Sequence, residues 1–116
     1  MTSHEKLTLA LGVADERKAQ EVIALDLRKL TLVTDYFLIC TGTSVAHLRG
    51  IAEVMLERFR ESGLRANGTE GYREAGWILL DFGDVVVHLF AEEEREYYRL
   101  ERLWADAPRV KIPAEE

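Results

Sequence analysis

The residues best placed to do chemistry are Gly42-Thr43-Ser44, which follow an apolar run and open an apparent helix. Backbone N–H groups at the start of a helix can hold an anion, such as the phosphate of a nucleotide. A phosphate loop also needs more glycines and a lysine, and the chain contains neither Gly-x-Gly-x-x-Gly nor Gly-Lys-Ser. Ser44 (or Thr43) is therefore better interpreted as the N-cap of the helix that follows.

Metal-dependent chemistry has little support in the sequence. Nucleotidyl transfer needs acids on alternate residues of one strand face, so that both can hold Mg²⁺. Asp81 and Asp84 are three residues apart and straddle a turn, which makes this reaction the weaker interpretation. His4, His47 and His88 do not have the spacing of a zinc site. The sequence predicts no metal site and no cofactor.

Nucleophilic catalysis is also disfavoured. Ser44, His47 and Asp81 could be drawn as a hydrolytic triad, but the nucleophile-elbow pattern Gly-x-Ser-x-Gly is missing. The single cysteine, Cys40, lies among apolar residues, excludes a disulfide within one chain and agrees with a reducing compartment. We therefore predict no catalytic residue and expect a protein that is not an enzyme.

The segment from Trp77 to Phe90 is predicted to form a β-hairpin. Two apolar, β-branched-rich runs flank Gly83-Asp84, and a two-residue connection with glycine first is typical of a type II′ turn. Such a turn sets the register, in which directly opposed residues share a face. The expected pairs are Phe82 with Val85, Asp81 with Val86, Leu79 with His88 and Trp77 with Phe90.

The two faces of this hairpin differ in composition. One is wholly apolar and is predicted to lie in a core: Ile78, Leu80, Phe82, Val85, Val87 and Leu89. The mixed face carries Trp77, Leu79, Asp81, Val86, His88 and Phe90. Large apolar groups with one acid and one imidazole are typical of a surface that meets a partner. The alternative is a face covered by the chain's own helix, with Asp81 and His88 hydrogen-bonded internally.

The remaining segments alternate between helix and strand. Helices are expected over residues 4–19, over 45–62 and from Glu92 onward, and strands over 22–27, 36–41, a weak 64–69 and the hairpin. This order predicts an α/β fold with a mixed sheet of about five strands and helices mainly on one face. Residues 1–108 are expected to form a single domain, followed by a flexible C-terminal tail over 109–116.

The composition restricts the possible partners. The 116 residues include 15 basic and 21 acidic ones, for a net charge of −6. Nucleic-acid binding depends on an excess of Lys and Arg, so no direct sequence-specific nucleic-acid binding is expected. An acidic chain instead attracts a basic protein. No apolar run is long enough for a membrane helix and no signal or transit segment is visible, which favours a cytoplasmic location.

From Ile23 to Pro108 the chain resembles the ribosomal silencing factor S family, also called Iojap-like. The order and spacing of the matching residues are together highly specific. They are Ala24-Leu25-Asp26, Thr34-Asp35-Tyr36-Phe37, Cys40 through Ser44, His47, Glu70-Gly71, Trp77 through Phe90, Arg95, Tyr98, Leu100-Glu101 and Leu103-Trp104.

The chain departs from the family at the start of the second helix. The family often has Ser-Arg after its Gly-Thr-Ser, where this chain has Val45-Ala46. The change removes a hydroxyl and a positive charge, which further weakens any anion-binding role there.

The resemblance implies a small homodimeric α/β protein with a nucleotidyltransferase-like topology and no catalysis. It implies binding to the large ribosomal subunit through the basic ribosomal protein fourteen of that subunit, which blocks joining of the small subunit. Translation would then be repressed when nutrients are limiting, in the cytoplasm of a bacterium. Two alternatives stay open: a nucleotidyltransferase-like enzyme and a homodimeric adaptor for another basic protein.

We assign partner binding to the mixed face of the hairpin and its surroundings. Trp77 would supply buried area, while Asp81 and Asp84 would meet Lys or Arg of the partner. The full predicted set is Trp77, Leu79, Asp81, Asp84, His88, Arg95 and Tyr98.

Overall fold

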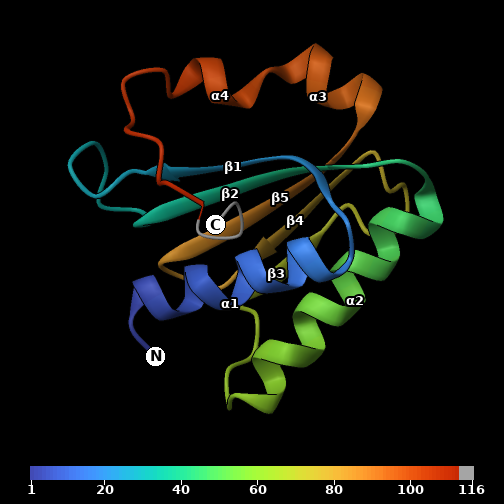
Figure 1. The fold of residues 1–116 in the computed structure, drawn as a ribbon, viewed down its shortest axis with the longest axis horizontal. Coiled ribbons are helices and arrows are strands. Elements are labelled where there is room, and N and C mark those ends of the chain that lie inside the picture. Colours follow the sequence, from blue (N-terminus) through green and yellow to red (C-terminus); the bar gives the residue numbers. More distant parts are fainter. Residues whose placement is uncertain (113–116) are drawn as a thin grey trace.

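A mixed five-stranded sheet forms the centre of the protein, in a computed structural model that describes residues 1–112 (Figure 1). The strand order is β1-β2-β5-β4-β3, in which only the β2–β5 pair is parallel. The predicted α/β fold with a mixed sheet of about five strands is therefore confirmed. The strands are β1 (Gln20–Asp26), β2 (Tyr36–Gly42), β3 (Gly68–Glu70), β4 (Trp77–Asp81) and β5 (Val85–Ala91).

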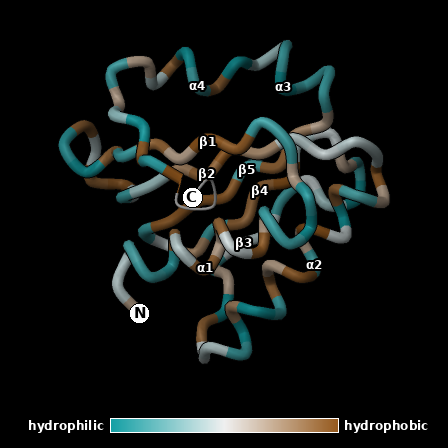
Figure 2. The backbone as a smooth tube through the Cα atoms, in the orientation of Figure 1, coloured by the Kyte–Doolittle hydropathy of each residue, from teal (hydrophilic) through white to brown (hydrophobic). Residues whose placement is uncertain are grey.

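The two long helices, α1 (Ser3–Glu16) and α2 (Val45–Glu61), lie together on one side of the sheet (Figure 1). The helix α2 turns an apolar stripe inward, and Figure 2 shows the apolar segments gathered between sheet and helices. All members of the predicted apolar face of the hairpin are buried in this core, at 2% exposure or less: Ile78, Leu80, Phe82, Val85, Val87 and Leu89. Hydrophobic burial of this face holds the hairpin against the two long helices.

Two short helices, α3 (Glu92–Tyr98) and α4 (Leu100–Leu103), lie on the opposite side of the sheet (Figure 1). With the segment that follows them, they cover a second, smaller apolar cluster: Leu25, Leu27, Ile39, Phe90, Leu100 and Ala107. Helices therefore cover both faces, and the prediction of helices mainly on one face holds for the two long ones.

The C-terminal segment runs beside β1 at the edge of the sheet. Arg109 is bridged to Leu25, and the Val110 N–H donates to the Ala24 carbonyl at 2.8 Å. Arg109 and Val110, predicted as the start of a flexible tail, are thus paired with a strand edge. Residues 113–116 of the predicted tail lie outside the described residues.

The ends of the elements follow local chemistry. The helix α1 begins after a Thr2–Glu5 capping box and ends at Glu16, earlier than predicted, because Lys18 adopts a positive φ of 59°. The helix α2 is followed by Gly63 at φ 85°, the predicted stop. The weak strand expected over 64–69 is only Gly68–Glu70.

The hairpin has the predicted register, from Trp77 opposite Phe90 to Asp81 opposite Val86. The Phe82 N–H donates to the Val85 carbonyl at 2.9 Å across the turn. Gly83 has φ 87° and Asp84 has no positive φ, as a type II′ turn requires.

None of the helices within residues 1–112 combines the length and apolar character that a membrane crossing requires.

Candidate functional site

The mixed face of the hairpin is only partly covered by α3 and α4. Val86 and Asp81 lie on it toward the turn, and Phe37 of β2 pairs with Val86 and extends the same surface. We call this half-exposed surface the open face, and define it as Phe37, Trp77, Leu79, Asp81 and Val86.

Two members of the predicted surface are instead sealed beneath the α3–α4 layer. His88 is 4% exposed and Phe90 is fully buried. The prediction that the whole mixed face turns outward is therefore wrong for these two residues. The alternative of internal hydrogen bonding holds for His88, whose Nδ1 accepts a hydrogen bond from Trp77 Nε1 at 3.1 Å. His88 supports Trp77 from beneath and does not reach a partner directly.

The environment of His88 keeps its ring neutral. Burial among the rings of Phe37 and Trp77 lowers the pKa of His88 to about 4, because a charged imidazole would lose its hydration there. Since Nδ1 accepts the Trp77 hydrogen bond, the proton of the neutral ring lies on Nε2. This Nε2 has no hydrogen-bond partner among residues 1–112.

Arg95 is also buried, at 5% exposure, which corrects its predicted place on the docking surface. Its Nη1 donates to Thr41 Oγ1 at 2.8 Å and its Nε to Glu101 Oε2 at 3.3 Å. The first bond joins α3 to β2, and the second joins α3 to α4. The sequence did not indicate this role, because it did not show which side of α3 faces the sheet.

The two acids of the hairpin have different partners. Asp84 accepts a hydrogen bond from Lys6 Nζ at 2.7 Å, and the same Nζ donates to the Phe82 carbonyl at 2.9 Å. Asp84 is therefore already paired to α1. Asp81 Oδ1 accepts the Gly83 N–H at 2.8 Å, and Oδ2 has no partner among the described residues. Of the two, Asp81 has the carboxylate oxygen that is free to meet a cation.

Aromatic side chains continue the open face onto α3. The Tyr98 ring lies 4.8 Å from that of Trp77 and is 46% exposed, while the adjacent Tyr97 is 81% exposed. Trp104 packs edge-on against Phe37 at 5.8 Å. Phe37, Tyr97 and Trp104 are absent from the predicted set. Phe37 reaches this surface through its pairing with Val86, which is distant in the sequence.

An exposed acid lies on the same side as the open face. Glu70 pairs with Leu79 across the β3–β4 ladder, so the two share a face of the sheet. Glu70 is exposed and forms no ion pair within residues 1–112. Together with Asp81 it gives this apolar surface a negative border.

The turn Gly42-Thr43-Ser44 serves the fold. Ser44 Oγ accepts the His47 N–H at 3.0 Å, the predicted cap. His47 Nδ1 accepts the Thr43 N–H at 2.9 Å, and its Nε2 lies 2.7 Å from the Arg17 carbonyl. Both ring nitrogens thus bind backbone groups and neither activates Ser44.

Among residues 1–112 no group of three or more His, Cys, Asp or Glu could hold a metal ion.

Comparisons with known proteins agree with one another. A family model described as "Ribosomal silencing factor during starvation" matches residues 1–116. A ribosomal silencing factor of Halalkalibacterium halodurans is 44% identical over 112 residues, covering 97% of this chain and 96% of the relative. One of Bacillus subtilis is 44% identical over 108 residues, covering 93% and 92%. A crystal structure from Chromobacterium violaceum superposes with a TM-score of 0.88 at 31% identity, covering 97% and 93%.

Proposed function

Because this chain belongs to the family of ribosomal silencing factors during starvation, we propose that it represses translation by occupying the large ribosomal subunit. It docks on the basic ribosomal protein fourteen of that subunit and blocks joining of the small subunit when nutrients are limiting. It acts in the bacterial cytoplasm, by its presence and without catalysis.

The observation that carries this proposal is the open face with its negative border. Trp77 and Leu79 offer apolar area that the α3–α4 layer leaves uncovered. Asp81 Oδ2 and Glu70 flank that area and complement a basic partner. Apolar anchors with a charged border are the usual arrangement of a protein–protein interface.

The side chain of Trp77, the main apolar contact of the open face, is already oriented before binding. Trp77 donates to His88 and its ring packs 4.9 Å from Phe90, which is fully buried. A side chain held in place loses little conformational entropy on binding, so more of the contact energy appears as affinity. A rigid sheet face of this kind suits a factor that acts by steric exclusion.

Two substitutions test the docking surface. Trp77→Ala with Asp81→Lys is expected to weaken binding to purified large subunits, and to isolated ribosomal protein fourteen, by at least about thirtyfold, the cost of losing one hot-spot aromatic. Glu57→Lys is the matched charge control, since Glu57 is exposed on α2, on the other side of the sheet. Unchanged affinity in the double variant, or an equal loss in the control, would count against the open face.

Subunit joining tests the mechanism itself. Purified protein added to separated subunits is expected to lower the yield of full ribosomes in a sucrose gradient, and the docking variant is expected to restore it. Co-sedimentation with large but not small subunits distinguishes this function from that of an adaptor for another basic protein. A yield that the wild-type protein leaves unchanged would refute repression by occupancy.

We also propose that the chain forms a homodimer. Leu32 and Val33 in the β1–β2 loop are almost entirely exposed, and large apolar side chains in that state favour association. Light scattering coupled to size-exclusion chromatography tests this. The mass of a single chain at all concentrations would contradict it.

A further inference from the structure

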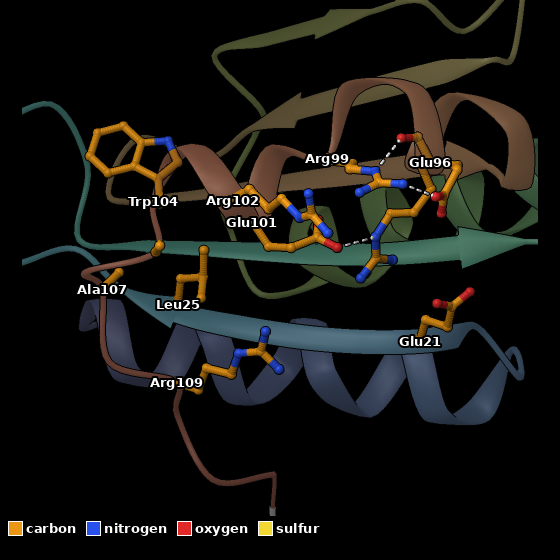
Figure 3. Close-up of a pocket in the computed structure, with 11 residues that line it drawn as sticks. Glu21, Leu25, Glu96, Arg99, Glu101, Arg102, Trp104, Ala107 and Arg109 are labelled. Carbon is orange, nitrogen blue, oxygen red and sulfur yellow. Dashed lines mark hydrogen bonds and ion pairs between the residues drawn. The ribbon is translucent and has the colours of Figure 1, made fainter.

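A cavity of about 420 Å³ lies over β1, between the α3–α4 pair and the C-terminal segment (Figure 3). Its lining is unusual for an acidic chain, because four arginines border it: Arg95, Arg99, Arg102 and Arg109. All four lie between residues 95 and 109, on α3, α4 and the segment that follows them, and Figure 3 shows Arg102 on α4 and Arg109 on the segment beside β1. The fold thus places several guanidinium groups around one cavity.

Carboxylates neutralise only part of this charge. Arg95 is paired with Glu101 and Arg99 with Glu96. Arg102 and Arg109 are exposed and form no ion pair within residues 1–112, and the remaining acid of the lining, Glu21, is likewise unpaired there. The cavity keeps a net positive charge in a molecule of net charge −6.

Arg95 makes the cavity more than a cluster of surface charges. It is 5% exposed, and Thr41 and Glu101 hold its Nη1 and Nε. Its remaining nitrogen, Nη2, has no partner among the described residues and is not fully buried. A rigidly held guanidinium with one free nitrogen binds an anion at low entropic cost, but only an anion that enters the hollow.

We propose that this cavity binds a phosphate group of a small ligand. Guanidinium groups match the geometry of phosphate oxygens, and arginines from several directions can share one phosphate. The volume lies in the range of small-molecule pockets. The surrounding net negative charge disfavours a long polyanion, whose binding depends on many basic contacts. A nucleotide is one carrier of such a phosphate group, and the competition experiment below tests it. Phosphate binding in this cavity does not depend on docking to the ribosome.

The probe is inorganic pyrophosphate, titrated into the full chain by calorimetry at low ionic strength. Saturable binding is expected for the wild-type protein and a loss of at least tenfold in affinity for Arg102→Ala with Arg109→Ala. Both residues are exposed and unpaired within the described chain, so the fold should survive, which circular dichroism checks. Arg60→Ala with Arg65→Ala is the matched control: it removes the same charge from exposed positions outside the cavity and should bind as the wild type does.

Competition identifies the carrier of the phosphate. Displacement of pyrophosphate by a nucleoside diphosphate supports the site and assigns it to a nucleotide. Displacement only by an RNA oligonucleotide without terminal phosphates would overturn the small-ligand assignment. No saturation by pyrophosphate up to about 1 mM, or an equal loss in the control variant, would overturn the site itself.

Discussion

The buried His88 predicts a specific loss of stability in mild acid. In the unfolded chain its imidazole binds a proton near the ordinary pKa of 6.5, whereas burial lowers the pKa in the folded protein to about 4. Between these values the unfolded state binds more protons, so stability falls as the pH falls. The contribution of the neutral ring is fully present above pH 6.5 and is lost progressively toward pH 4.

The size of the effect follows from the same two values. At about 1.4 kcal/mol for each tenfold change in proton affinity, the shift from 6.5 to about 4 corresponds to about 3 kcal/mol when complete. By about pH 5 the loss should reach about 2 kcal/mol relative to about pH 7.5.

A non-titrating variant isolates this group from the carboxylates, which titrate in both proteins. His88→Gln keeps an acceptor for Trp77 Nε1 and has no proton to gain. Urea unfolding followed by the fluorescence of Trp77 and Trp104 gives the free energy of unfolding at each pH. The wild-type protein should lose about 2 kcal/mol more than the variant between the two pH values. Parallel curves for the two proteins would refute the reasoning.

Three further predictions concern the framework of the fold. Gly71 has φ 78°, and an added Cβ would lie 2.0 Å from the Trp77 carbonyl oxygen. Gly71→Ala should therefore lower the free energy of unfolding by at least about 2 kcal/mol and weaken docking through Trp77. Stability in urea equal to that of the wild-type protein would refute this. Ser44→Ala should cost about 1 kcal/mol by removing the α2 cap, whereas Ser44→Asp should keep most of the stability. Burial raises the pKa of the Cys40 thiol to about 12, so a thiol reagent should label Cys40 only after unfolding, and rapid labelling of the native protein would contradict its placement.

Short-range features of the site were predictable. A two-residue turn with Gly83 first leaves one register for the strands on either side, and the five observed pairs follow it. The Ser44 cap and the Gly63 stop were equally predictable, because each depends on residues within one helical turn. The family resemblance was visible because matching residues keep their order along the chain.

The covering of the mixed face was not predictable in the same way. It depends on a break at Arg99, whose φ of 45° divides the predicted final helix into α3 and α4. An arginine in this conformation leaves no pattern in the sequence, since glycine or asparagine is the usual signal. The break lets Leu100 enter the cluster over Phe90.

The amino-acid sequence by itself determined the hairpin, its two faces and the family, because each rests on neighbouring residues or on their order. Only the tertiary structure decided that Trp77, Leu79 and Asp81 stay accessible while His88 and Arg95 are enclosed. That choice depends on where α3 and α4 pack, and packing between distant segments is set by the burial of apolar surface in three dimensions, which no local pattern records.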